Sequence, residues 1–169
     1  MKIFIPKMYQ KNIFTINYNK LKQAGIKLLI FDLDNTLGSI DETVINEETK
    51  NFLTNLATNF QIVIASNSKK KRVSKFCSNL NIPFYTFSLK PTKKSFIKIK
   101  NDYNLDYNKM AIIGDQILTD IFGGNRLGIY TILVDPLDID FKVSKINRLI
   151  EKKINLKNGI IRGNYYEKD

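Results

Sequence analysis

The chain has 169 residues, enough for one domain with a short appendage, and its 43% hydrophobic residues are enough to build a buried core. It carries 27 Lys and Arg against 16 Asp and Glu, a formal net charge of +11. It has no His and one Cys, which excludes His-based catalysis, zinc sites built from His or Cys clusters, and intrachain disulfides. Phosphoryl or hydrolytic chemistry would therefore depend on carboxylates, Lys, Ser or Thr and a hard metal ion.

Apolar strands and amphipathic helices alternate along the chain. In chain order, we expect strand 27–32, helix 46–57, strand 61–65, helix 69–80, strand 83–87, helix 92–103, strand 109–113, helix 119–127 and strand 129–134. Asn46 and Ser68 are the expected caps of the helices that follow them. This alternation predicts an α/β fold, a three-layer doubly wound parallel sheet with about five strands.

The expected core covers residues 1–140, including a short N-terminal extension, and residues 141–169 are expected to form a basic helical tail. Such a tail either packs on the core or lies at an anionic membrane surface. We find no apolar stretch that could cross a bilayer and no signal peptide, so we expect a cytoplasmic protein whose membrane contact, at the inner face, is peripheral. The apolar face of the tail contains Ile146, Leu149, Ile150 and Ile154.

Chemically useful side chains follow four successive strands of the expected sheet, at the edge where ligands bind in such folds. Clustered carboxylates repel one another, and a hard cation such as Mg²⁺ relieves this repulsion. Carboxylates, a hydroxyl, a Lys and Mg²⁺ together suit a phosphoryl group. In chain order these side chains are Asp32 and Asp34, Ser66 and Asn67, Lys90, and Asp115 and Asp120.

The same residues occur in four ordered motifs. Residues 31–37 (FDLDNTL) resemble the first motif of the haloacid dehalogenase (HAD) superfamily, and residues 64–67 (IASN) its second. Lys90 resembles the third motif, and residues 114–120 (GDQILTD) the fourth. With the Lys90-Pro91 pair and residues 114–134, the chain resembles the YqeG-type, subclass IIIA phosphatases of this superfamily, from about Ile5 to the last expected strand.

The resemblance implies a metal site built from four aspartates. Asp32 would be the nucleophile and a Mg²⁺ ligand. Asp34 would be the general acid and base, with its backbone carbonyl on the metal. Asp115 would bind Mg²⁺ directly, and Asp120 would bind it through water or orient the loop.

The resemblance also implies how the phosphoryl group is held. Ser66, aided by Asn67, would bind its oxygens, and Lys90 would stabilise its charge. Lys69 and Lys70, at the start of the next helix, are added as substrate-binding residues because their charge lies near the same edge of the sheet.

Each of these residues also has a simpler interpretation. Asp32 and Asp34 are common turn residues after a strand, Ser66 could only cap the following helix, and Asp120 could only complement a helix dipole. Lys90 could be a solvated loop residue, with Lys93 and Lys94 as close alternatives.

The positive charge is concentrated between the second and third motifs. Residues 69–100 hold 10 basic and no acidic residues, whereas residues 101–140 hold 2 basic and 7 acidic residues. The spacing of the motifs leaves no room for a cap domain, so the site is expected to be open unless a neighbouring subunit of an oligomer covers it. An open site with a basic approach suits a phosphate on a large, anionic molecule.

The resemblance favours one such substrate, phosphatidylglycerophosphate, a membrane lipid that would be converted to phosphatidylglycerol. Two alternatives remain. One is a phosphatase acting on nucleic acid ends or phosphoproteins, and the other is a non-catalytic basic module that binds RNA or ribosomes through the same fold.

Overall fold

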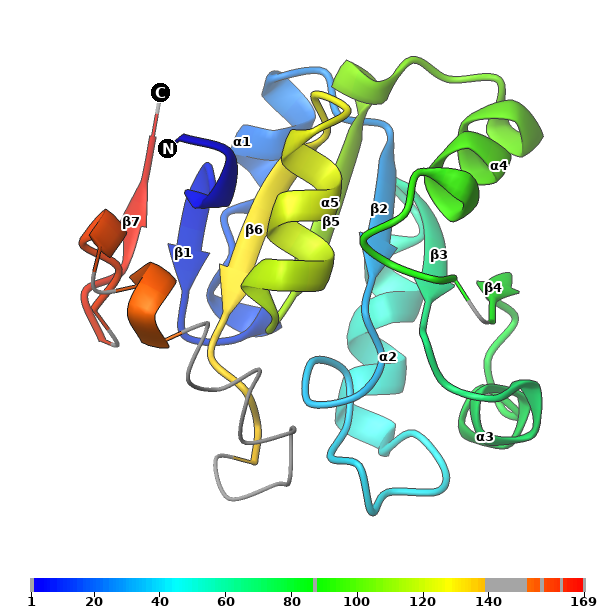
Figure 1. The fold of residues 1–169 in the computed structure, drawn as a ribbon. Coiled ribbons are helices and arrows are strands. Elements are labelled where there is room, and N and C mark those ends of the chain that lie inside the picture. The colour runs from blue at the N-terminus through cyan, green and yellow to red at the C-terminus, as the bar shows by residue number, and fades with distance from the viewer. Residues whose placement is uncertain (1, 87, 139–151, 156, 162, 169) are drawn as a thin grey trace.

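The computed structural model describes all residues except 1, 87, 139–151, 156, 162 and 169 (Figure 1). Its centre is a seven-stranded sheet, among the described residues, in the order β4-β3-β2-β5-β6-β1-β7. Every neighbouring pair is parallel except β1 and β7. In chain order the strands are β1 (Met8–Gln10), β2 (Leu28–Phe31), β3 (Gln61–Ala65), β4 (Phe84–Tyr85), β5 (Met110–Gly114), β6 (Tyr130–Val134) and β7 (Tyr166–Glu167). The five strands expected from the sequence are confirmed, and the short strands β1 and β7 extend the sheet at one edge.

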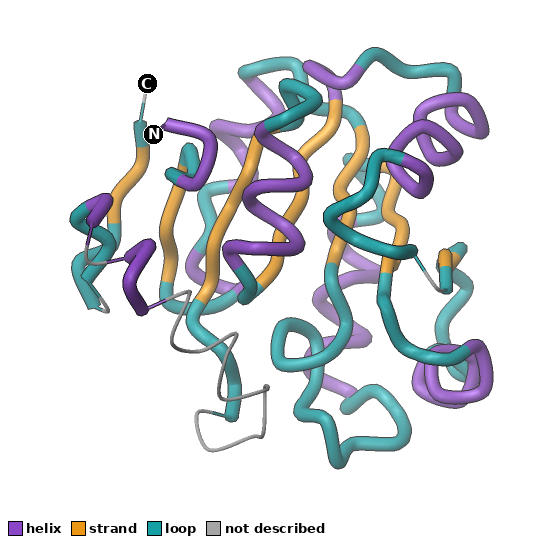
Figure 2. The backbone as a smooth tube through the Cα atoms, in the orientation of Figure 1, coloured by secondary structure: helices purple, strands orange, loops and turns teal. Residues whose placement is uncertain are grey.

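Helices cover both faces of the sheet, as the tube in Figure 2 shows, so the three expected layers are confirmed. The helices α1, α2 and α3 pack on one face, and α4 and α5 pack on the other. Their bounds are α1 (Tyr18–Gln23), α2 (Glu47–Leu56), α3 (Lys70–Phe76), α4 (Lys94–Tyr103) and α5 (Phe122–Asn125), with short 3-10 turns η1 (Lys2–Phe4), η2 (Ile13–Thr15) and η3 (Tyr107–Lys109) and a π-helical turn η4 (Ile117–Ile121).

The central strand β2 explains the layering. Successive side chains of a strand point to opposite faces of the sheet. Accordingly, Leu28 and Ile30 belong to the core beneath α4, whereas Leu29 and Phe31 belong to the core beneath α2 and α3. All four side chains are fully buried. A strand that is apolar on both faces has no solvent-facing side, which fixes β2 in the middle of the sheet.

One expected helix cap is confirmed, and two other helix starts differ from expectation. Asn46 caps α2 as predicted, because its Oδ1 accepts from the backbone N–H of Thr49 at 2.8 Å. Ser68 does not cap α3: the N-cap is Lys69, without a side-chain capping bond, and the Ser68 hydroxyl donates to Asp34 instead. The helix expected at 119–127 begins earlier, as the π-helical turn η4 that runs into α5.

Among the described residues, no cap domain is inserted between the strands. Residues 32–60, all described, contain a long loop and α2, and the described part of residues 66–90 contains α3 and β4. None of the helices among the described residues has both the length and the apolar character needed to cross a membrane.

The end of the chain returns to the sheet. Strand β7 pairs with β1, and Ile160 is buried in a small core with Tyr9 and Leu133. Most of the predicted amphipathic face, Ile146, Leu149 and Ile150, lies outside the described residues, as does Phe87 at the end of the third expected strand.

Candidate active site

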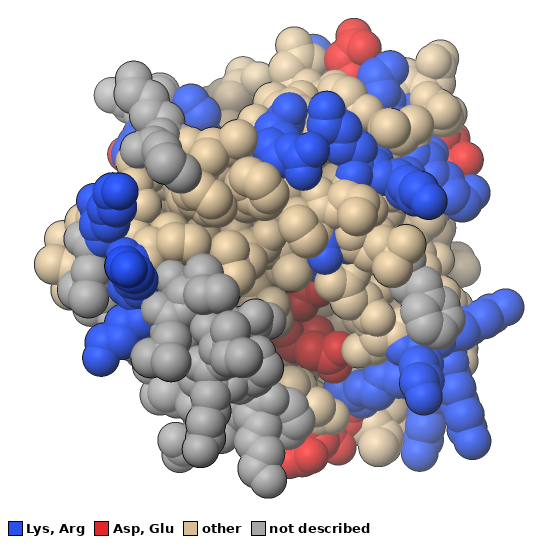
Figure 3. Space-filling view, in the orientation of Figure 1, with Lys and Arg blue, Asp and Glu red and all other residues tan. Residues whose placement is uncertain are grey.

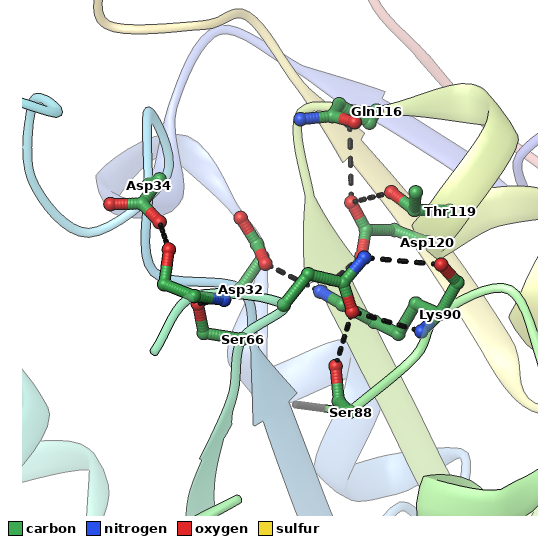
Figure 4. Close-up of polar contacts among 10 residues, drawn as sticks. Asp32, Asp34, Ser66, Ser88, Lys90, Gln116, Thr119 and Asp120 are labelled. Carbon is green, nitrogen blue, oxygen red and sulfur yellow. Dashed lines mark hydrogen bonds and ion pairs between the residues drawn. The ribbon is translucent and has the colours of Figure 1, made fainter. Parts of the chain in front are cut away.

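Three aspartates meet at the carboxyl end of the sheet. Asp32 directly follows β2, and Asp115 directly follows β5. Because β2 and β5 are parallel neighbours, these two residues lie side by side. Asp120, in η4, folds back toward them (Figure 4). One carboxylate oxygen from each of Asp32, Asp115 and Asp120 lies within 4.8 Å of the others, and we call these residues the carboxylate cluster.

Lys90 enters the cluster from the loop after β4. Its Nζ donates to Asp32 Oδ1 and, at 2.6 Å, to Asp120 Oδ1. The residue is 95% buried, whereas Lys93 and Lys94 are exposed. The structure therefore places Lys90, and neither of the two alternative lysines, among the carboxylates.

Burial sets the electrostatics of the cluster. Removal from water raises the pKa of Asp32 to about 7; the Lys90 charge opposes this rise and Asp120 adds to it. Burial lowers the pKa of Lys90, but the carboxylates of Asp120 and Asp32 outweigh burial and raise it above its usual value. With all carboxylates ionised, three negative charges face one ammonium group, so two negative charges remain to be balanced. Oxygen ligands with this residual charge fit a hard divalent cation.

A glycine allows Asp120 to come this close. A Cβ at Gly114 would lie only 2.4 Å from Cγ of Asp120, a distance that no side chain could tolerate. The second carboxylate oxygen of Asp120 accepts from the backbone N–H of Gln116 at 3.3 Å and from Thr119 Oγ1 at 3.2 Å. The π-helical turn therefore directs one carboxylate oxygen of Asp120 toward the cluster. The other oxygen accepts hydrogen bonds from Gln116 and Thr119, which belong to the same turn or directly precede it.

Asp34 has other partners, although it is only two residues from Asp32. Ser68 Oγ donates to one of its carboxylate oxygens at 2.6 Å, and Arg72 Nη2 donates to the other at 2.9 Å. The Arg72 guanidinium also donates to the backbone carbonyls of Glu42 and, at 3.2 Å, Ser39. Arg72 thus connects α3 to the loop that carries Asp34.

Asn67 connects the second motif to the third. Its Oδ1 accepts from Ser88 Oγ at 2.8 Å and from the backbone N–H of Lys90 at 2.9 Å, and its Nδ2 donates to the Lys90 carbonyl at 3.1 Å. Ser66 is buried, and its Oγ accepts from the backbone N–H of Ser68 at 3.0 Å. The side chain of Asn67 therefore positions the backbone of Lys90.

Lys69 and Lys70 are surface residues in the structure. Both are exposed at the start of α3, and no hydrogen bond or ion pair within the described residues joins either side chain to the cluster. Figure 3 shows acidic atoms recessed in the middle of one face, with Lys and Arg side chains beside the hollow over α3.

Sequence reasoning missed three residues of the site: Ser68 was assigned only a capping role, and Arg72 and Ser88 were given no partner. Arg72 contacts Asp34 across 38 residues of sequence, and Ser88 contacts Asn67 across 21. A periodic sequence pattern indicates only which residues share a face of one helix or strand. No local signal could therefore have revealed these contacts between distant parts of the chain.

The chain matches known proteins over most of its length. A family model described as mitochondrial PGP phosphatase matches residues 1–138. The probable phosphatase YqeG of Bacillus subtilis is 37% identical over 155 residues, which are 90% of this chain and 90% of that protein. The chloroplastic phosphatidylglycerophosphate phosphatase 1 of Chlamydomonas reinhardtii is 27% identical over 79% of this chain, but this chain covers only 53% of that longer protein.

A solved structure shares the fold. A HAD family enzyme from Bacteroides thetaiotaomicron, in complex with magnesium and inorganic phosphate, superposes with a TM-score of 0.57. The match covers 72% of this chain and 100% of that chain, at 13% sequence identity. At this identity the similarity establishes the fold.

Proposed function

Because the chain belongs to the mitochondrial PGP phosphatase family, we propose that it is a Mg²⁺-dependent hydrolase that removes the terminal phosphate of phosphatidylglycerophosphate. It is a phosphatase of the HAD superfamily. The observation that carries the proposal is the carboxylate cluster with Lys90, whose residues follow strands β2, β4 and β5 at one edge of the sheet. Two relatives of the chain carry the name of this lipid phosphatase.

The metal would be held by Asp32, Asp115 and Asp120, with the backbone carbonyl of Asp34 as a further oxygen ligand. The all-oxygen donor set and the residual charge of the cluster fit Mg²⁺. Bound Mg²⁺ would neutralise the charge of the phosphoryl oxygens beside the nucleophile.

Asp32 is the proposed nucleophile. One of its carboxylate oxygens forms a bond to phosphorus while the bond from phosphorus to the glycerol oxygen breaks, which leaves an aspartyl phosphate. The Lys90 ammonium group, which already binds Asp32, stabilises the charge on the phosphoryl oxygens. Ser66 and the backbone of Asn67 donate to those oxygens.

Asp34 is the proposed acid and base. It gives its proton to the departing glycerol oxygen and then takes a proton from the water that attacks phosphorus. This second step releases inorganic phosphate and regenerates the Asp32 carboxylate. Contacts with Ser68 and Arg72 hold both oxygens of the Asp34 carboxyl group in place at the edge of the site.

The proposal is tested by measuring phosphate release from phosphatidylglycerophosphate in detergent micelles, from 3′- and 5′-phosphorylated oligonucleotides and from a phosphopeptide. We expect rapid, Mg²⁺-dependent release from the lipid alone, loss of release in EDTA, and no turnover by Asp32→Asn. Faster release from an oligonucleotide or the phosphopeptide would assign a different substrate. No turnover of any phosphomonoester by the native protein would overturn the assignment as an enzyme and favour the RNA-binding alternative.

A further inference from the structure

A groove lies beside the loop that carries Lys90. It has a volume of about 440 Å³ and lies between the start of α3, β4 and α4. Ser88 and Leu89, which line it, directly precede Lys90 in the chain. We call it the basic groove; its lining is Lys70, Phe84, Tyr85, Thr86, Ser88, Leu89, Lys94, Ser95 and Lys98.

The groove is positively charged. Three lysines line it, and none of the described residues that line it is acidic. Lys98 is paired with Asp102 at 3.1 Å. Among the described residues, neither Lys70 nor Lys94 has a carboxylate partner, so their charges are available to a ligand. A concave surface with two uncompensated ammonium groups favours an anion.

A buried hydroxyl in the wall of the groove has no hydrogen-bond partner among the described residues. Ser95 is only 8% exposed, and its Oγ makes no hydrogen bond within the described part of the chain. A buried hydroxyl without a partner costs free energy that a ligand oxygen would recover. Ser95 also stands in the first turn of α4, whose N-cap, Lys93, makes no side-chain capping bond. The N–H groups of this turn therefore add positive potential where Lys94 and Ser95 line the groove.

Apolar side chains stand exposed beside these charges. Leu89 is 53% exposed and has a φ of 51°, a left-handed conformation that costs a non-glycine residue about 1–2 kcal/mol. Ile97, on α4 between Lys94 and Lys98, is 44% exposed. Exposed apolar residues next to lysines are typical of surfaces that lie at the boundary between lipid headgroups and acyl chains.

We propose that the basic groove binds the phosphate of an anionic phospholipid and docks the protein on the membrane beside the active site. This inference rests on the proposed function, because a lipid substrate must be reached at a bilayer surface. Lys70, Lys94 and the Ser95 hydroxyl hold the phosphate oxygens, and Leu89 and Ile97 enter the acyl boundary. The bound phosphate belongs to a neighbouring lipid and is not the one that is hydrolysed.

The test is co-sedimentation of the full chain with vesicles of phosphatidylcholine, with and without phosphatidylserine, a lipid that is neither substrate nor product of the proposed reaction. We expect binding only to the anionic vesicles, and weaker binding as salt screens the charges. Lys70→Gln combined with Lys94→Gln should weaken this binding roughly 25-fold, at about fivefold for each lysine lost from an anionic surface. Ser95→Ala should weaken it about tenfold without lowering the melting temperature, because the lost hydroxyl has no partner to leave unsatisfied.

The matched control is Lys22→Gln combined with Lys27→Gln. These exposed lysines line a groove at the opposite end of the strands, and the double variant carries the same change in charge. The proposal is overturned if the control weakens vesicle binding as much as the groove variants do, if Ser95→Ala binds as the native protein does, or if single-stranded RNA displaces the protein from vesicles through the same residues.

Phosphate release from phosphatidylglycerophosphate in detergent micelles separates the docking hypothesis from the proposed function. Turnover of the lipid without vesicle docking refutes the groove alone, and docking without turnover refutes the proposed function alone.

Discussion

Asp32 and Asp34 lie two residues apart and have opposite surroundings. Asp32 is buried and bonded to Lys90, which is itself buried between two carboxylates. The side chain of Asp34 is 21% exposed and is bonded to Arg72 at the edge of the site. The comparison teaches that one short motif can place two carboxylates in different environments, because both follow the end of β2 and the loop there directs them to different partners. The inner carboxylate is held in a low dielectric, and the outer one remains close to water.

The largest expected effect is a loss of turnover, and it should differ between variants of the two aspartates. Asp32→Asn should abolish turnover, because the amide cannot form the aspartyl phosphate. Asp34→Asn should slow hydrolysis of a glycerol phosphate ester about 10²–10⁴-fold, the usual contribution of a general acid or base. For nitrophenyl phosphate, whose leaving group needs no proton, formation of the phosphoenzyme should be much less affected. Burst kinetics measure the rate of phosphoenzyme formation with each ester. If Asp34→Asn lowers this rate equally for both esters, Asp34 is not the general acid.

The two ion pairs should differ in their effect on stability. Lys90→Met leaves the buried carboxylates without their cation, which typically costs about 3–5 kcal/mol. Urea unfolding in EDTA measures this loss, and added Mg²⁺ should restore part of it by binding the same carboxylates. Arg72→Met, at the more exposed pair, is the matched control and should cost less. Equal losses would mean that burial does not distinguish the two sites.

Alanine substitutions at two glycines test whether Asp120 must lie close to the other carboxylates. A Cβ at Gly114 would lie 2.4 Å from Asp120, and a Cβ at Gly124 would lie 2.7 Å from Cγ2 of Thr131 in the core. Either alanine should destabilise the fold by about 1–3 kcal/mol through overpacking. Only Gly114→Ala should also raise the Mg²⁺ concentration needed for half-maximal activity. A normal Mg²⁺ requirement in Gly114→Ala would show that the position of Asp120 does not matter for the metal.

The smallest effect should come from the residues that hold Asp34. Arg72→Gln should lower kcat for the glycerol phosphate ester about 10- to 100-fold, because one charge-assisted hydrogen bond to Asp34 is worth about 1.5–3 kcal/mol. Ser68→Ala should have a smaller effect, since it removes a neutral donor. Both variants should retain KM and lose less with nitrophenyl phosphate. A purely structural role would instead lower turnover of both esters equally, and Arg72→Lys should restore part of the loss.

The strands were the part of the fold that could be predicted. Apolar runs such as residues 28–31 indicate a buried strand. Their alternation with helices along the chain implies a parallel sheet, in which the polar residues that follow the strands lie at one edge. Strands β1 and β7 were missed because two or three residues carry no periodic signal. Strand β1 forms by pairing with the edge of β6, and β7 forms by pairing with β1. Helix α1 was missed because six residues are too short for helical spacing to be distinguished.

The sequence by itself determined which chemical groups reach the active edge, because each of them directly follows, or lies a few residues beyond, a strand that burial defines. Only the tertiary structure decided which of these groups meet. It placed Lys90 rather than Lys93 or Lys94 between Asp32 and Asp120, and it directed Ser68 to Asp34 instead of to a helix cap. The physical reason is that such contacts join residues 30 to 58 positions apart, whose separation depends on how whole layers pack and on the space left by Gly114.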